Sequence, residues 1–301
     1  MHNAWPALLA GTGIASLLPV VWRLRRGFRG TALEPAWPWT GLVWLTWVIV
    51  PVVTIVEPPL AGWSDVLWYF AAVVALTPPI AVLGARRPTS RVWAWFVLLP
   101  LVMVFVWPLL PVLRREGVTS ELSLEAPVVV GYALVLLMGA GNYLGLRFSM
   151  SALLWTAGLI LVVFPLCPTT AGWLPGAQTG RVCGSLFLTA AGWIADRQVA
   201  AGRPSDSGIP LNRVWGDFRE LFGIVWARRV QERFNDEARR KGLPVRLSIH
   251  GLEGASGHLP AGGFDEPSLA AAEALLRWLL QKFVEPGWID ARLARQFRLS
   301  A

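Results

Sequence analysis

The chain has 301 residues and a formal net charge of +8, and only 15% of its residues are charged, against about 25% in an ordinary soluble domain. Residues 1–195 hold 17 of the 46 Asp, Glu, Lys and Arg residues, so this part cannot supply the polar shell of a water-soluble protein. The two cysteines are too few for a disulfide framework or a zinc site. The basic residues lie beside apolar segments rather than in a groove motif, so we expect no nucleic-acid partner.

Apolar segments of transmembrane length recur through residues 1–196. A transmembrane helix needs about 20 mostly apolar residues, and six stretches approach that length without an ionised side chain. They are Ala4–Trp22, Trp37–Val56, Val66–Ala85, Val92–Leu113, Ala126–Leu146 and Met150–Cys167. A seventh, Val182–Ala195, is shorter, and a re-entrant segment is the alternative there. We predict an all-α membrane protein with about seven transmembrane helices in residues 1–196.

The placement of arginine predicts the orientation in the membrane. Only Met1-His2-Asn3 precedes the first apolar segment, whereas four arginines follow it between Arg23 and Arg29. This is the reverse of the order in a cleavable signal peptide, and the positive-inside rule puts the first loop in the cytoplasm. We therefore predict a multi-pass protein of the cell inner (plasma) membrane, in contact with the lipid bilayer, with its N-terminus outside and its C-terminus in the cytoplasm.

Residues 197–211 are rich in Gly, Pro, Ser and Asp and are predicted to form a linker. Residues 212–301 are predicted to form a small α+β domain on the cytoplasmic side. Its expected elements are a helix from Asn212 to about Lys241, a half-buried strand from Pro244 to His250, a glycine-rich loop from Gly251 to Gly263 and a helix from Asp265 to about Val284. One strand cannot satisfy its own edges, so it must pair with the following loop, another copy of the chain or a partner.

Groups that carry chemistry are scarce in the predicted membrane region. No Asp, Glu, His, Lys or Arg lies within the first six predicted spans, which disfavours proton-coupled transport. The three histidines, His2, His250 and His258, all lie outside the spans, so no intramembrane metal or nucleophile arrangement can be assembled. We expect no catalytic, cofactor-binding or metal-binding residues, and no enzymatic activity.

Cys167 and Cys183 flank the predicted outer loop from Pro168 to Val182. A disulfide between them could close this loop if that side is oxidising. The alternative is a pair of free, buried thiols in apolar surroundings.

Gly141 and Gly145 form a small-xxx-small pair in the fifth predicted span. Such pairs let two helices approach closely, and Asn142 between them could hydrogen-bond across the contact. Packing within one chain is the first interpretation, and a dimer face or a solute contact is the alternative.

These features predict a non-enzymatic scaffold, sensor or accessory subunit. Its cytoplasmic tail would dock a cytosolic protein or form a homo-oligomer. The alternative function is a permease or channel-like subunit for a neutral or hydrophobic solute, because proline recurs within the predicted spans and broken helices can form solute sites.

Overall fold

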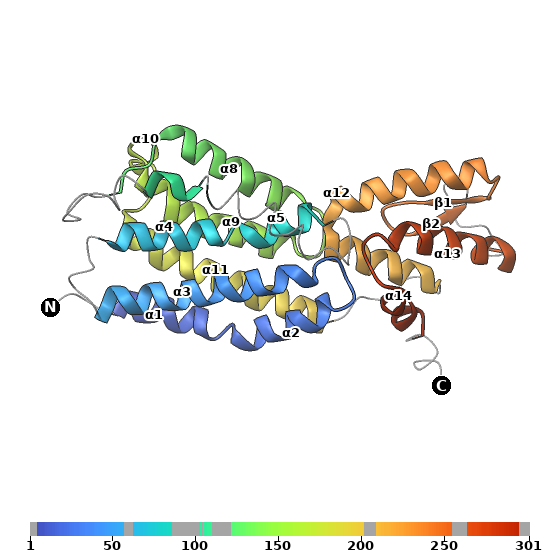
Figure 1. Ribbon diagram of the computed structural model, residues 1–301, viewed down its shortest axis with the longest axis horizontal. Coiled ribbons are helices and arrows are strands. Elements are labelled where there is room, and N and C mark those ends of the chain that lie inside the picture. Colours follow the sequence, from blue (N-terminus) through green and yellow to red (C-terminus); the bar gives the residue numbers. More distant parts are fainter. Residues whose placement is uncertain are drawn as a thin grey trace. The chain divides into compact units, whose positions relative to one another are not determined.

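The computed structural model describes residues 5–56, 63–85, 103, 105–109, 122–201, 209–254 and 264–294. These residues are mostly helical, with one small two-stranded sheet (Figure 1). The chain divides into two compact units. The helical unit comprises residues of Met1–Gly27, Pro35–Gly84 and Val92–Ala201. The C-terminal unit comprises residues of Phe28–Glu34, Ala85–Arg91 and Gly202–Ala301.

The described part of the helical unit is almost entirely helical. Its helices are α1 (Trp5–Ala15), α2 (Leu18–Phe28), α3 (Trp37–Val56), α4 (Ser64–Val74), α5 (Thr77–Leu83), α8 (Ala126–Gly141), α9 (Ser149–Val163), α10 (Pro168–Ala171) and α11 (Ala177–Ala200), with 3-10 turns η1 (Glu34–Ala36), η3 (Trp107–Leu109) and η4 (Phe164–Leu166). Within the described residues, four stretches are long and apolar enough to cross a membrane. They are Trp5–Phe28, Glu34–Thr54, Ser64–Leu83 and Ser149–Leu166.

The remaining predicted spans differ from these four. The stretch from Val92 to Leu113 lies largely outside the described residues. Helix α8 ends at Gly141, five residues before the predicted end, because Gly145 adopts a left-handed φ of 77° in the following turn. Helix α11 is longer than predicted, at 24 residues, but contains charged side chains. The structure therefore supports membrane-spanning helices, while the number seven stays a prediction.

Prolines break the third candidate span into α4 and α5. Pro78 has no backbone N–H to donate to the carbonyl of Val74. The Thr77 hydroxyl donates to that carbonyl instead, at 2.7 Å. The buried break is therefore satisfied by a side chain, as a helix in lipid requires.

Aromatic side chains of neighbouring helices donate hydrogen bonds to backbone carbonyls of α4. The indole of Trp47 donates to Ala71 at 3.0 Å, and the hydroxyl of Tyr132 donates to Ala72 at 2.9 Å. Both donors are almost fully buried. Such a polar tip on a large apolar ring links two helices without leaving an unpaired donor, so α4 occupies the core of the unit.

The C-terminal unit begins with the long helix α12 (Pro210–Arg240), which bends at Gly223. Gly223 has φ 81° and ψ 178°, a conformation that is essentially restricted to glycine. The bend lets Phe222 and Trp226, on either side of it, both pack edge-on against Phe283, with ring centroids 5.5 and 5.0 Å away. The helix predicted from Asn212 to Lys241 is thus present as two arms.

A β-hairpin follows α12. Strand β1 (Val245–Leu247) pairs antiparallel with β2 (Leu252–Gly254), which lies inside the predicted glycine-rich loop. The side chain of Asn235 accepts from the Leu247 N–H at 2.7 Å and donates to its carbonyl at 3.0 Å. The predicted strand therefore pairs with the segment after it, the first of the three predicted alternatives, and an asparagine of α12 satisfies its outer edge.

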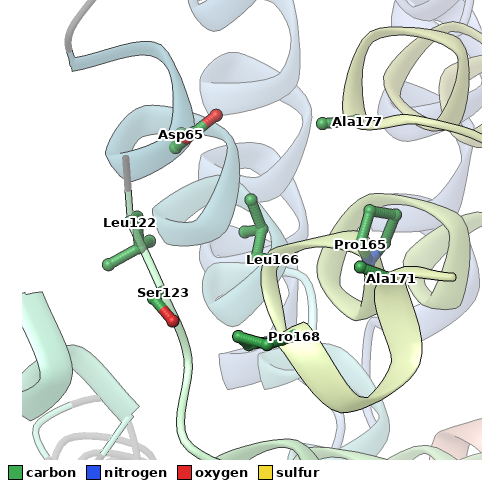
Figure 2. A pocket seen from close by; sticks show the side chains of 8 residues that line it. All are labelled: Asp65, Leu122, Ser123, Pro165, Leu166, Pro168, Ala171 and Ala177. Atoms are coloured by element: carbon green, nitrogen blue, oxygen red, sulfur yellow. The ribbon is translucent and has the colours of Figure 1, made fainter. Parts of the chain in front are cut away.

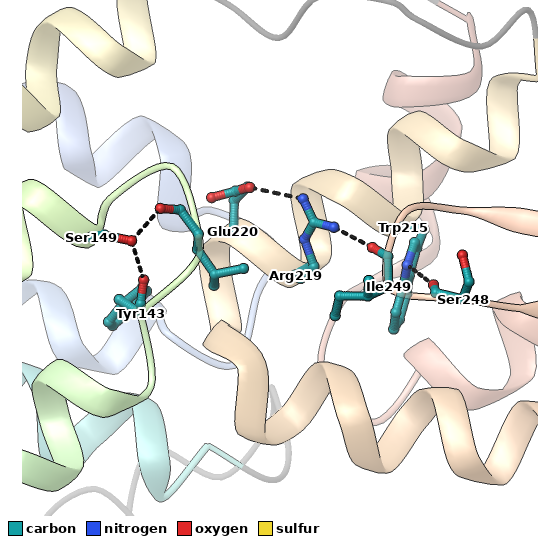
Figure 3. A network of polar contacts seen from close by, with 8 residues as sticks. Tyr143, Ser149, Trp215, Arg219, Glu220, Ser248 and Ile249 are labelled. Atoms are coloured by element: carbon teal, nitrogen blue, oxygen red, sulfur yellow. Dashed lines mark hydrogen bonds and ion pairs between the residues drawn. The ribbon is translucent and has the colours of Figure 1, made fainter.

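The turn between the strands is also held by α12 (Figure 3). Trp215 donates from its indole to the carbonyl of Ser248 at 2.9 Å. The buried guanidinium of Arg219 donates to the carbonyl of Ile249 and forms an ion pair with Glu220 at 3.1 Å. These contacts fix the hairpin on the first arm of α12.

Two further helices complete the C-terminal unit. Helix α13 (Glu266–Leu280) begins as predicted, with Asp265 accepting from the Ser268 N–H at 3.3 Å as an N-cap. Beyond the end of α13, Pro286 opens α14 (Pro286–Leu293), a helix that the sequence pattern did not predict; proline is favoured at the first helical position. Arg277 of α13 joins the two helices through Asp290 at 2.6 Å.

The segment Phe28–Glu34 folds with the C-terminal unit although it lies between α2 and α3 in the sequence. Thr31 and Val284 form an antiparallel bridge. The N–H of Ala32 donates to Phe283 at 2.7 Å, and the N–H of Glu285 donates to Gly30 at 2.8 Å. Sequence periodicity gave no sign of this pairing, because it joins residues about 250 positions apart without a repeated pattern.

Candidate functional site: a polar pocket at one end of the helical unit

A pocket of about 380 Å³ lies in the helical unit where several helices begin. Figure 2 shows the residues that line it: Asp65, Leu122, Ser123, Pro165, Leu166, Pro168, Ala171 and Ala177. Six of these eight described residues have apolar side chains, and Asp65 and Ser123 add one carboxylate and one hydroxyl. This composition is typical of small-molecule sites, in which a few polar groups orient a ligand against an apolar lining.

Proline and backbone pairing shape this pocket. Pro165 and Pro168 lie in η4 and α10, the short turns that follow α9. The N–H of Leu124 donates to the carbonyl of Leu166 at 2.8 Å. This bond holds the extended segment of Leu122 and Ser123 against η4, opposite the first turns of α4 and α11.

An ion pair between α4 and α11 adjoins the pocket. The Arg181 guanidinium pairs with Oδ1 of Asp65 and also donates to the Ser64 hydroxyl at 3.0 Å. The two charged side chains are only 10% and 23% exposed, so the pair lies in surroundings where an isolated charge would be costly. Asp65 is thus both a pocket-lining residue and the partner of a buried arginine.

A second ion pair lies near the other end of α11. Asp196 pairs with Arg23 of α2 at 3.1 Å. Arg181 and Asp196 are separated by about 22 Å along the helix, at 1.5 Å per residue. Helix α11 therefore carries a positive charge near one end and a negative charge near the other, each paired with another helix.

The sequence analysis missed the Asp65–Arg181 pair. The predicted spans Val66–Ala85 and Val182–Ala195 each begin one residue after a charge, because the search required segments without ionised side chains. Complementary charges just before two spans on the same predicted side were the signal that could have found it.

Both cysteines are free thiols in the structure. Cys167 is buried and lies 3.1 Å from the hydroxyl of Thr169, whereas Cys183 is half-buried on α11. Cys167 therefore lies beside the pocket, between the lining residues Leu166 and Pro168, and is not bonded to Cys183 in the structure. The disulfide between Cys167 and Cys183 stays a prediction.

The predicted packing pair of Gly141 and Gly145 does not lie on one helix face. Gly141 ends α8, and Gly145 lies in the turn beyond it. A Cβ built on either glycine meets no described atom within 4 Å. Asn142 is buried at the C-cap of α8. The close approach in α8 is instead at Gly139, whose added Cβ would lie 3.0 Å from Pro79 of α5.

Glycines of α9 and α11 make the closest helix contact in the described residues of this unit. A Cβ on Gly184 would lie 2.6 Å from the carbonyl oxygen of Gly158, and one on Gly180 would overlap the carbonyl oxygen of Leu161. Gly180 and Gly184 form a small-xxx-small pair of the predicted kind. It was missed because the predicted seventh span began after Gly180.

No group of three His, Cys, Asp or Glu that could hold a metal ion occurs within the described residues. Comparisons with protein families, with curated proteins and with solved structures find no match to this chain. The pocket and its ion pair are therefore interpreted from their own chemistry.

Proposed function

We propose that this chain is a non-enzymatic scaffold, sensor or accessory subunit of the inner membrane. Its C-terminal unit docks a cytosolic protein through one face of α13. The observation that carries this proposal is an exposed row of uncharged side chains on that helix.

The α13 face is unusual for a helix in a water-exposed domain. Pro267, Ala270, Ala274 and Trp278 are all exposed and follow one another at intervals of three or four residues, so they share a face. Trp278 is 44% exposed. Exposed tryptophan is typical of protein interfaces, where this residue is enriched among those that dominate binding.

The shape of this row favours a partner helix as the occupant. Alanine leaves a shallow path along α13, into which the side chains of an apolar helix face can fit, and Trp278 provides a raised edge for it. A second copy of the chain is the other outcome that the experiment below distinguishes.

Backbone pairing supports the proposed cytoplasmic location. The segment Phe28–Glu34 joins the first two candidate spans and folds within the C-terminal unit. If both spans cross, the C-terminal unit lies on the same side as this loop, which follows the arginine-rich end of α2. The positive-inside rule assigns that side to the cytoplasm.

The same pairing constrains the number of crossings. If the proposed topology holds, the chain crosses an even number of times between the loop and the C-terminal unit, whereas the described residues of this interval contain three candidate spans. At least one further crossing is needed. At 24 residues, α11 would extend about 36 Å, enough for the hydrocarbon core of about 30 Å. Because its charges are paired, α11 is the best-supported additional span. Six crossings between the first loop and the C-terminal unit, together with the crossing before that loop, give the proposed seven.

The docking proposal is tested with the Trp278→Ala variant. The full-length protein is expressed in its native host, isolated in detergent with its bound proteins, and compared with wild type by quantitative mass spectrometry. Val225→Ala is the matched control, because Val225 is an apolar side chain of the same unit that is 38% exposed. We expect a partner to be lost in Trp278→Ala and retained in Val225→Ala.

Two results would overturn this docking proposal. One is a partner set that is unchanged by Trp278→Ala. The other is a Trp278→Ala variant that loses only the association with a second copy of the chain, which would assign the face to a homo-oligomer.

The pocket favours a second candidate function, a permease or channel-like subunit for a neutral or hydrophobic solute. The pocket adjoins η4 and α10, two short elements that contain proline, and interrupted helices of this kind also form the solute sites of carriers. Purified protein in liposomes should then catalyse solute flux, and Ala177→Phe, which places a large side chain at the pocket wall, should lower the rate. If the folded wild-type protein catalyses no flux, the permease proposal is contradicted and the docking proposal is favoured.

A further inference from the structure

Among the described residues that line the pocket, Asp65 is the one ionised side chain. Arg181 pairs with its Oδ1, and no other described side chain or backbone group bonds to this carboxylate. A carboxylate has room for about four hydrogen bonds, so its second oxygen can accept from a ligand. In Figure 2 the Asp65 carboxylate extends on the side of Ala177.

The charge balance of the described residues at the site indicates the kind of ligand. Asp65 and Arg181 together are neutral, so a bound monocation or monoanion would leave one unmatched charge in a partly buried site. A zwitterion adds one charge of each sign. The ammonium of the zwitterion can donate to Oδ2 of Asp65, while the Arg181 guanidinium pairs with Oδ1 of the same carboxylate.

The opposite charge of such a ligand also has a place. Ala177 lines the pocket and is the first residue of α11, and the first N–H groups of a helix have no acceptor within the helix. They carry the positive end of the helix dipole, which favours a carboxylate. Donors for a carboxylate and an acceptor for an ammonium therefore border the same cavity.

The remaining wall fixes the size and the character of the ligand. A volume of about 380 Å³ is at the lower end of ligand pockets, which span roughly 300–1,000 Å³. Leu122, Leu166 and Pro168 offer apolar surface beside the polar groups. We propose that this pocket binds a small zwitterionic amino acid with an apolar side chain, a binding site that goes beyond the docking function and does not depend on it.

The test is isothermal titration calorimetry on the full-length protein in detergent. Glycine, L-valine, L-leucine and L-phenylalanine probe the size of the ligand. Leucinol, which lacks the carboxylate, and 4-methylpentanoate, which lacks the ammonium, probe the need for both charges. We expect saturable binding of at least one of the larger amino acids, and binding of leucinol and 4-methylpentanoate at least about tenfold weaker.

Variants locate the binding. Ala177→Phe fills the pocket while leaving Asp65 and Arg181 unchanged, and should abolish binding. Asp65→Asn should weaken it at least about tenfold. The matched control is Asp196→Asn, which alters the ion pair at the other end of α11 and should bind as wild type. Ala177→Phe keeps the test decisive if Asp65→Asn folds poorly.

Three results would overturn the proposal: no saturable binding of any amino acid by the wild-type protein, binding that Ala177→Phe leaves unchanged, or equal binding of the singly charged analogues. The assay uses no cytosolic partner and no residue of α13. Its failure would therefore leave the docking proposal untouched, and loss of docking in Trp278→Ala would leave this site untouched.

Discussion

Asp65 and Arg181 are the residues through which an apolar helical unit accommodates charge. Each would be costly alone at the end of a helix in lipid, but each compensates the other, and the Ser64 hydroxyl takes a further guanidinium N–H. The second pair, Asp196 with Arg23, is more open, since Arg23 is 50% exposed. The two pairs should therefore contribute unequally to stability.

We expect Asp65→Ala to lower the free energy of unfolding by about 3 kcal/mol, because it leaves the Arg181 guanidinium buried without its counter-charge. Replacing both residues, in Asp65→Ala/Arg181→Leu, should recover most of that loss. Asp196→Ala serves as the control and should cost less than about 1 kcal/mol, because the Arg23 guanidinium that it leaves without a partner is 50% exposed, whereas Asp196 itself is 12% exposed. Denaturation of the full-length protein in detergent measures all three, and equal effects of the two single substitutions would contradict this account.

Asp265 makes the stability of α13 depend on pH. The hydrogen bond from the Ser268 N–H lowers the pKa of the Asp265 carboxyl below its ordinary value of 3.8. A group whose folded pKa is depressed stabilises the fold above its unfolded pKa, and this contribution is lost as pH falls through the folded pKa.

The melting temperature of wild type should therefore exceed that of Asp265→Ala above pH 3.8. The two should converge at lower pH, where both lack a charged cap. Glu266→Gln changes a neighbouring carboxylate that makes no cap bond and should follow wild type. A constant difference between wild type and Asp265→Ala at all pH values would rule out the carboxylate as its source.

At the scale of elements, glycines determine two features of the fold: the close contact of α9 with α11 and the bend in α12. Gly180 and Gly184 allow the backbones of α9 and α11 to touch. Gly223 folds α12 around Phe283. Both depend on the missing Cβ, in one case for space and in the other for backbone conformation.

Substituting the contact glycine should separate α9 from α11. Gly184→Ala places a methyl group 2.6 Å from the carbonyl oxygen of Gly158, and overpacking of this kind costs about 1–3 kcal/mol. Gly141→Ala, at a glycine with open space around its Cβ position, is the matched control and should be nearly neutral. Thermal unfolding in detergent compares them, and a neutral Gly184→Ala would show that the helices do not meet there.

Gly223→Ala should destabilise the C-terminal unit by about 2 kcal/mol, because alanine is strained at a φ of 81°. Gly287→Ala, at a helical glycine with ordinary φ and open space, is its control. Hydrogen exchange across residues 210–240 reads out the effect locally. Exchange in Gly223→Ala that matches wild type would mean that α12 is straight.

Sequence periodicity predicted the elements that repeat a local pattern. The apolar spans, the helix after Asn212, the strand at Val245 and the cap at Asp265 each follow from spacing within one segment. Pairings between distant segments were not predictable in this way. The contact of Asp65 with Arg181 and the bridge of Thr31 with Val284 depend on tertiary arrangement. Gly180 was also missed. The seventh span was predicted to begin after the charged Arg181, which Asp65 neutralises in the fold.

At the scale of the whole molecule, the pairing of Phe28–Glu34 with the strand-like segment at Val284 ties the first loop to the C-terminal unit. In the proposed topology each candidate span therefore has one direction, and the chain between the first loop and the C-terminal unit crosses the membrane an even number of times. The proposed arrangement puts the pocket at the outer ends of the helices and the α13 face in the cytoplasm, which is the order a sensor or an accessory subunit needs.

Labelling of single cysteines with a membrane-impermeant maleimide tests this arrangement most directly. Three substitutions, Trp173→Cys, Arg29→Cys and Glu266→Cys, are introduced separately into a chain that carries Cys167→Ser and Cys183→Ser. All three positions are exposed, and Trp173 is 83% exposed. In intact cells Trp173→Cys should react, while Arg29→Cys and Glu266→Cys should react only after the membrane is permeabilised. Reaction of Glu266→Cys in intact cells, or of Arg29→Cys and Glu266→Cys from opposite sides, would contradict the account.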